Sequence, residues 1–305
     1  MTIPIANVYY LLCYAWDKLE EGEIVDVAGI PSARLPDLFA HVLVGAVSRL
    51  LRTGLDRGYI EIEDETARPR GRIDLTGSIR RALMVRGRLH CRYDELTYDV
   101  LHNRLIKSTM EYLLLLRDLD GSLRESLEGL YRKLAEVTSM RLETRAFRRV
   151  QLHRNIRFYE FALRVCELVA ANLLVDEESG EAQFRDFVRD EKAMARLFEA
   201  FVRNFYRREQ VRYAVTRERV AWDGQGISST DASWLPAMQT DAILRSAERT
   251  IVLETKYYGE ALQRHYDHEA VRSGHLYQLF AYLRNIEARG DAYQHTEGML
   301  LCQNG

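Results

Sequence analysis

The sequence lacks long apolar runs and contains few residues that interrupt regular structure. No stretch of its 305 residues approaches the ~18 consecutive apolar residues that span a bilayer, so we expect no membrane association. Only 5 prolines and 18 glycines are present, while 47% of the residues are hydrophobic and 29% are charged. This composition excludes collagen-like, low-complexity and disordered classes and predicts a folded globular protein.

Several motifs of cofactor-binding and secreted proteins are also missing. The 4 cysteines lie far apart without a CxxC spacing, which is typical of reduced cytoplasmic thiols and argues against a zinc site. The apolar start has no basic leader, so we expect a cytoplasmic protein. No GxxxxGK[ST] loop occurs, so the chain itself is not expected to bind a nucleotide by that route. The net charge of -2 gives no global nucleic-acid signature, and any anionic partner must meet a local patch.

The spacing of apolar residues predicts a first half that is mainly helical. Alternating residues at 59–63, followed by a Pro69-Arg70-Gly71 turn and by 72–75, predict a small β insertion in this half. The acidic segment 176–180 is the best linker candidate, which places an N-terminal domain at 1–175. The expected helices cover approximately 5–19, 38–51, 78–85, 99–116, 123–137 and 159–174.

The second half has a different order of elements and is expected to form a domain at 181–305. Its pattern predicts an α/β (α+β) fold in which a mixed central sheet is flanked by helices. The expected helices cover approximately 191–209 and 268–286, and the expected strands cover 213–222, 238–244, 250–258 and 298–301.

Two acids and a lysine on neighbouring predicted strands form the most informative pattern. Because side chains alternate along a strand, Glu254 and Lys256 are expected on one face. A hairpin that brings Asp241 beside Glu254 creates a hard-oxygen site suited to Mg²⁺, with Mn²⁺ as an alternative. Such a metal site with an adjacent cation suits phosphodiester hydrolysis. The competing interpretation is a solvated charge pattern on an exposed strand, but the apolar neighbours Val252 and Leu253 favour a buried one.

Glu199 on the preceding helix and Gln278 on the following helix complete the pattern of a nuclease of the PD-(D/E)xK type. We predict supporting roles for both residues at this site. Each also has a plain alternative as a polar residue on a helix surface.

Six stretches of the chain together form a recognisable pattern: 3–16 (IPIANVYYLLCYAW), 71–73 (GRI), 103–109 (NRLIKST), 131–134 (YRKL), 254–258 (ETKYY) and 276–279 (LYQL). In this order they resemble the McrC family, the endonuclease subunits of McrBC systems, which cut DNA containing modified cytosine. By this resemblance Asp241, Glu254 and Lys256 occupy the catalytic positions. The second acid is Glu254 where the family often has Asp, and family members typically continue for some tens of residues beyond the position of Gly305, which leaves open a C-terminal truncation.

The resemblance also implies a partner, because McrC-like subunits work with a separate AAA+ GTPase ring, McrB. The family's N-terminal region inserts into this ring and stimulates GTP hydrolysis. In this chain the segment after Tyr59, up to Arg92, suits that role, since its part 70–92 holds seven arginines against one acid, Asp74. We expect Arg70 and Arg72 at the tip of a projecting turn, where they contact the partner. DNA phosphate or a solvated basic surface are the alternatives.

The resulting hypothesis is an Mg²⁺-dependent endonuclease subunit of a modification-dependent (type IV) restriction system acting on double-stranded DNA with modified cytosine. Two alternatives stay open, a stand-alone RecB-like nuclease and a non-catalytic assembly subunit. The three intact catalytic-type residues favour catalysis, and a helical half that cutting does not require favours a partner.

Overall fold

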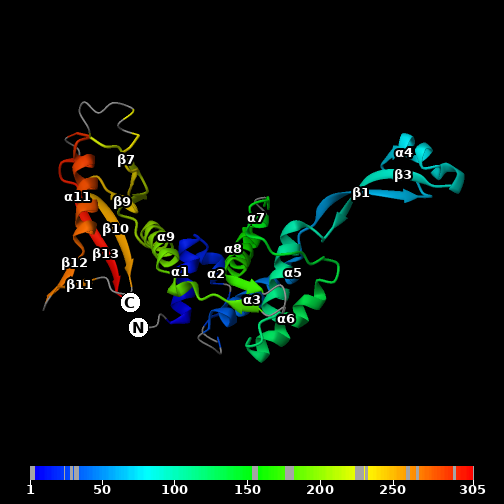
Figure 1. Ribbon diagram of the computed structural model, residues 1–305, viewed down its shortest axis with the longest axis horizontal. Helices are drawn as coiled ribbons and strands as arrows, with labels where there is room; N and C mark the ends of the chain where they lie inside the picture. Colours follow the sequence, from blue (N-terminus) through cyan, green and yellow to red (C-terminus); the bar gives the residue numbers. More distant parts are fainter. Residues whose placement is uncertain are drawn as a thin grey trace. The chain divides into compact units, whose positions relative to one another are not determined.

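The computed structural model divides the chain into two compact units (Figure 1). The sheet unit comprises Met1–Ala28 and Asp186–Gly305, and the helical unit comprises Gly29–Arg185. The predicted boundary near 175–181 lies close to this division, but the first 28 residues belong with the sheet unit and not with the N-terminal domain predicted at 1–175. The structure describes residues 4–23, 25–27, 30, 34–152, 157–175, 182–223, 230, 233–258, 262–265, 268–290 and 293–304, so the predicted linker at 176–180 lies outside the described residues.

The helical unit is built around long amphipathic helices that bury one face each. Leu38, Leu43, Leu105, Met110 and Phe161 are fully buried in its core, as the helical spacing predicts. The helices are α3 (Leu35–Thr53), α5 (Leu101–Leu114), α6 (Gly121–Lys133), the short α7 (Thr144–Phe147) and α8 (Arg157–Asn172), and a small ladder joins β4 (Leu173–Val175) to β5 (Ala182–Phe184).

The predicted β insertion is an arm that leads away from these helices, with α4 at its far end (Figure 1). Its strands are β1 (Gly58–Thr66), β2 (Arg72–Asp74) and β3 (Leu89–Thr97), and α4 (Leu75–Arg80) and the 3₁₀ helix η1 (Leu83–Arg86) follow β2. The two predicted strands do not pair with each other, because β3 lies between them and pairs antiparallel with both. The sequence pattern gave no separate signal for β3, whose polar and apolar residues do not alternate cleanly.

Asn103 fixes the base of this arm to the helical unit. Its side-chain amide donates hydrogen bonds to the Asp56 carbonyl (3.0 Å) and to the Tyr98 carbonyl (2.8 Å), which lie just before β1 and just after β3. The hydroxyl of Tyr159 donates to the Asn103 side-chain oxygen at 2.9 Å. Nearby, the buried Lys107 ammonium donates to the carbonyls of Leu134 (2.9 Å) and Val137 (2.6 Å). Polar residues of the stretch 103–109 therefore have a structural role.

The sheet unit contains a four-stranded mixed sheet in the order β13-β10-β9-β6. The central strand β10 (Thr250–Tyr258) pairs parallel with β13 (Glu297–Asn304) and antiparallel with β9 (Ala242–Arg245), which pairs antiparallel with β6 (Ala214–Thr216). This confirms the predicted mixed sheet. Smaller two-stranded ladders join β7 (Arg219–Val220) to β8 (Met238–Gln239) and β11 (Leu262–His265) to β12 (His268–Val271).

One helix covers each face of this sheet. Ile251 and Leu253 pack with Phe198 and Val202 of α9 (Glu191–Glu209), while Val252 on the other face packs against α11 (Ser273–Glu287). The second predicted helix, at 268–286, begins later than expected because residues 268–271 pair as β12. Sandwiching between two helices explains why β10 is a continuous apolar run before its polar end.

The first helix, α1 (Ile5–Ala15), packs against α9, which accounts for its place in the sheet unit. The Asn204 amide donates to the carbonyls of Tyr14 (2.9 Å) and Ala15 (3.1 Å), and the Tyr14 hydroxyl donates to Glu209 at 2.7 Å. The Tyr14 ring also lies against Phe201 and Phe205. Among the described residues, none of the helices has the length and apolar character needed to cross a membrane.

Candidate active site

The hairpin of β9 and β10 brings Asp241 and Glu254 side by side, as the sequence predicts. The strands pair Leu253 with Ala242, so the next step along the register sets Glu254 opposite Asp241. The Asp241 carboxylate is held through Oδ2, which accepts hydrogen bonds from the backbone N–H and the hydroxyl of Thr255, both at 2.7 Å. These two bonds orient the carboxylate, and neither of them involves its other oxygen, Oδ1.

A chain of hydrogen bonds runs from Glu254 into α11. The Lys256 ammonium donates to Glu254 Oε1 at 2.7 Å and to Gln278 Oε1 at 3.0 Å, so the predicted shared face of the strand is observed. Gln278 Nε2 donates to the Tyr282 hydroxyl at 2.8 Å, and this hydroxyl donates to the Gln239 carbonyl at 3.0 Å. Gln278 therefore positions Lys256 and is not merely a polar residue on a helix surface.

Glu254 is the most unusual titratable group of the site, because it is only 1% exposed. Burial, together with the negative charge of Asp241, raises the pKa of the Glu254 carboxyl to about 7, although the Lys256 hydrogen bond opposes this shift. Within the described part of the chain, its second oxygen, Oε2, is buried and has no hydrogen-bond partner. A buried carboxylate oxygen without a partner is costly unless something else binds it.

Glu199 reaches the same region from α9, but two arginines hold its carboxylate. Arg203 Nη1 lies 3.0 Å from Glu199 Oε1, and Arg217 Nη2 lies 2.7 Å from the same oxygen. Arg203 also donates to the Asp241 backbone carbonyl at 3.2 Å. Glu199 therefore anchors an ion-pair network that reaches the Asp241 backbone, and its supporting role in the chemistry stays a prediction.

All five residues predicted for this site line one cavity of about 440 Å³, namely Asp241, Glu254, Lys256, Glu199 and Gln278. In the described residues no group of three or more His, Cys, Asp or Glu side chains is arranged to hold a metal ion. The two carboxylates of Asp241 and Glu254 nevertheless fit Mg²⁺, which is usually bound by one or two carboxylates together with substrate phosphates. The unpartnered Glu254 Oε2 is the observation that supports this fit.

The two arginines predicted to contact a partner lie on the arm, but not at its tip. The strand register sets Arg72 opposite Arg92, part-way along β3, and Gly71 fits against the Arg92 carbonyl with a positive φ of 56°. The Arg70 guanidinium lies over the Tyr93 ring, 5.8 Å from its centroid. The expected tip position is wrong because β2 returns alongside β3 before the chain reaches α4, and the tip consists of α4 and η1.

Sequence reasoning missed three residues that build the site: Tyr282, Arg203 and Arg217. Two of them carried a signal, since Tyr282 follows Gln278 by one helical turn and Arg203 follows Glu199 by one turn. Arg217 carried none, because its contact with Glu199 depends on the pairing of strands that are distant in sequence.

Comparisons with known proteins agree with this architecture. A family model described as McrBC 5-methylcytosine restriction system component matches residues 7–300. The chain is 34% identical over 285 residues to the Escherichia coli (strain K12) protein described as type IV methyl-directed restriction enzyme EcoKMcrBC, covering 93% of this chain and 82% of that protein.

A solved structure has a similar fold. It is a chain of the refined half-complex from the tetradecameric assembly of Thermococcus gammatolerans McrB AAA+ hexamers with bound McrC, with a TM-score of 0.56 and 19% identity. The match covers 90% of this chain and spans 61% of the length of that one. Because the family model matches nearly the whole sequence and the E. coli relative is similar over most of both chains, this protein belongs to the family of McrBC 5-methylcytosine restriction system components.

Proposed function

We propose that this protein is the DNA endonuclease subunit of a modification-dependent restriction system and hydrolyses phosphodiester bonds with Mg²⁺. The observation that carries the proposal is the joining of Asp241, Glu254 and Lys256 at the end of one buried hairpin, around a single cavity. A buried carboxyl with a pKa raised to about 7 beside a lysine is costly in free energy, which favours a functional role. The sheet flanked by α9 and α11 fits the PD-(D/E)xK type of nuclease.

The residues divide the chemistry among them. The carboxylates of Asp241 and Glu254 would hold Mg²⁺, which when bound polarises a phosphate and acidifies a water molecule. Lys256, fixed by Gln278, presents a cation that orients the attacking water or stabilises negative charge on the phosphate. The Glu199–Arg203 pair supports the backbone at Asp241, so the first carboxylate keeps its position.

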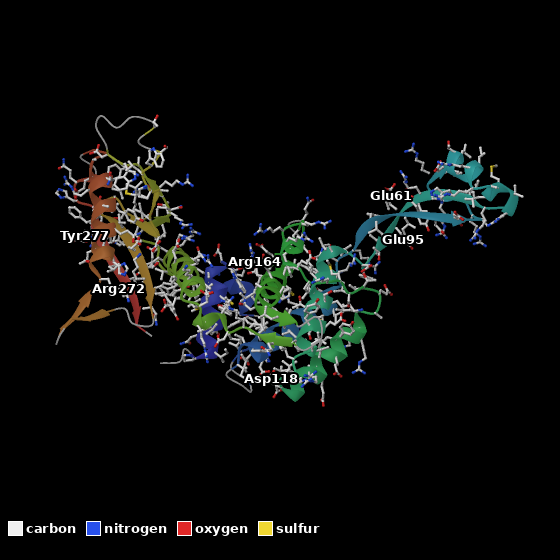
Figure 2. The ribbon with its side chains drawn as sticks, in the orientation of Figure 1. Glu61, Glu95, Asp118, Arg164, Arg272 and Tyr277 are labelled. Atoms are coloured by element: carbon white, nitrogen blue, oxygen red, sulfur yellow. The ribbon has the colours of Figure 1, made fainter. Side chains whose placement is uncertain are left out.

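The arm is the proposed contact with a McrB-like AAA+ GTPase ring. The tip segment 75–89 contains four arginines and no acid, whereas the strands carry both acids, among them Glu61 and Glu95 (Figure 2), and the arginines Arg72 and Arg92. Arg92 pairs with Glu61 at 3.1 Å and Arg81 pairs with Glu65 at 3.2 Å. Acids of β1 therefore neutralise two of the seven arginines in the segment 70–92. Arg70 and Arg72, on the side of the arm, remain the proposed partner contacts. The tip adds exposed apolar side chains, Leu75, Ile79, Met84 and Val85.

Reconstitution tests this function and separates it from its rivals. The chain is combined with its cognate GTPase, GTP and Mg²⁺ on DNA with and without 5-methylcytosine, and cleavage products are measured. We expect cleavage of modified DNA only when every component is present, because the chain has a net charge of -2 and little means of holding DNA alone. Degradation of unmodified DNA by the chain alone would favour a stand-alone nuclease. Binding to the GTPase without any cleavage would favour an assembly subunit.

A further inference from the structure

One side of the active-site cavity is lined by basic residues that are not among the proposed catalytic residues. Lys192, Ala195 and Arg196 of α9 line the cavity together with the catalytic residues. Their spacing of three and four residues sets them on one side of the helix. The opposite side of α9 carries Met194 and Phe198, which are buried. The helix packing therefore turns Lys192 and Arg196 toward the cavity.

Lys192 and Arg196 differ from the other cations around this site. Lys256 donates to Glu254 and Gln278, and Arg203 donates to Glu199. Over the residues that the structure describes, the exposed side chains of Lys192 and Arg196 form no ion pair or hydrogen bond. The acidic Glu191 also lines the cavity, but residues adjacent in sequence do not face each other on a helix.

We propose that Lys192 and Arg196 bind the phosphates of one DNA strand and hold that strand against the active site. This inference rests on the proposed nuclease function. The carboxylates of Asp241 and Glu254 repel a polyanion, so a strand approaching them needs cations that are not already bound to protein acids. The small Ala195 between the two cations leaves room for the strand to approach the helix. Arg196 can contact a phosphate through two N–H groups, while Lys192 acts as a point charge.

The test is the salt dependence of DNA binding by the full chain assembled with its partner GTPase, measured by fluorescence anisotropy with a short labelled duplex that contains 5-methylcytosine. The variant Lys192→Gln/Arg196→Gln is compared with Arg212→Gln/Arg284→Gln, which removes the same charge from two exposed side chains of the same unit that do not line the cavity. Losing two phosphate contacts should lower the slope of log K against log salt by about 1.8 and weaken binding about tenfold or more at low salt. The control pair should keep the wild-type slope. Equal slopes for wild type and the Lys192/Arg196 variant, or equal losses in both double variants, would overturn the proposal.

A cleavage assay in the reconstituted complex separates this proposal from the proposed function. The Lys192→Gln/Arg196→Gln variant should cut more slowly at limiting DNA, while GTP hydrolysis by the partner keeps its wild-type rate. Asp241→Asn is measured in parallel. If Asp241→Asn cuts as fast as wild type, the nuclease assignment fails, and the salt slope still decides the role of the two cations. If Asp241→Asn is inactive but the double variant cuts like wild type, the two cations do not position the strand.

Discussion

At the scale of single residues, Glu254 gives the site a distinct dependence on pH and metal. Its pKa of about 7 lies above the ordinary 4.5, so between these values the native chain retains a proton that the unfolded chain releases. The free energy of unfolding should therefore fall as pH rises through this window and stay level above it. Glu254→Gln should lose this dependence, which urea unfolding at pH 5 and pH 8 measures.

Stabilisation by a divalent ion should increase as pH rises, whereas the stability of the metal-free chain should fall. Mg²⁺ or Mn²⁺ binds the ionised carboxylates, so either ion should raise the melting temperature more at pH 8 than at pH 6. Asp241→Asn serves as the control, because it removes one carboxylate while leaving Glu254 in place. The same metal-induced shift in wild type and Asp241→Asn, at both pH values, would contradict a site built from two carboxylates.

Residue patterns could predict part of this site from the sequence, for physical reasons. Strand periodicity alone sets Glu254 and Lys256 on one face, and a hairpin joined by a short turn fixes Asp241 beside them. The contacts of Arg217 with Glu199 could not be predicted, because they depend on which strands pair and in what register. Periodicity shows which side of a segment is apolar, but it does not show which other segment covers that side.

At the scale of elements, the side-chain amide of Asn103 is one of the contacts that hold the base of the arm. Asn103→Ala removes the hydrogen bonds to the Asp56 and Tyr98 carbonyls and leaves the Tyr159 hydroxyl without its acceptor. We expect a destabilisation of about 1 to 3 kcal/mol, because buried polar groups lose their partners. Hydrogen exchange should show faster exchange in β1 and β3 than in α6. Unchanged protection of the two strands would mean that other contacts hold the arm.

Arg70 and Arg72, on the side of the arm, are expected to stimulate GTP hydrolysis by the partner. Arg70→Ala/Arg72→Ala should reduce stimulation of the GTPase, since a charge-assisted contact contributes about 1.5 to 3 kcal/mol. Arg117→Ala/Arg132→Ala, on the helical unit outside the arm, controls for loss of charge. Steady-state GTP hydrolysis at saturating subunit measures the effect. Stimulation equal to wild type would assign Arg70 and Arg72 to DNA contact or to solvent, and would leave the apolar tip as the contact.

At the scale of the whole molecule, the chain separates its two proposed tasks between two compact units. The helical unit carries the arm, and the sheet unit carries the cavity with its acids and cations. The sequence predicted a boundary near residue 180, but it did not predict that α1 packs on α9. The stripe of α1 that buries Val8, Tyr9 and Leu12 suits packing against many helices, so local pattern could not identify its neighbour.

The central claim is that the cavity lined by Asp241 and Lys256 is the nuclease site. Comparing DNA cleavage among complexes that differ by one substitution tests this claim most directly. Wild type, Asp241→Ala, Lys256→Ala and the Arg212→Gln control are each assembled with the partner GTPase, and cleavage of methylated DNA is measured beside GTP hydrolysis. We predict that Asp241→Ala and Lys256→Ala abolish cleavage while GTP hydrolysis stays at the wild-type rate, because the cavity and the arm lie in different units. Cleavage at the wild-type rate by either variant would contradict the assignment of this cavity as the nuclease site.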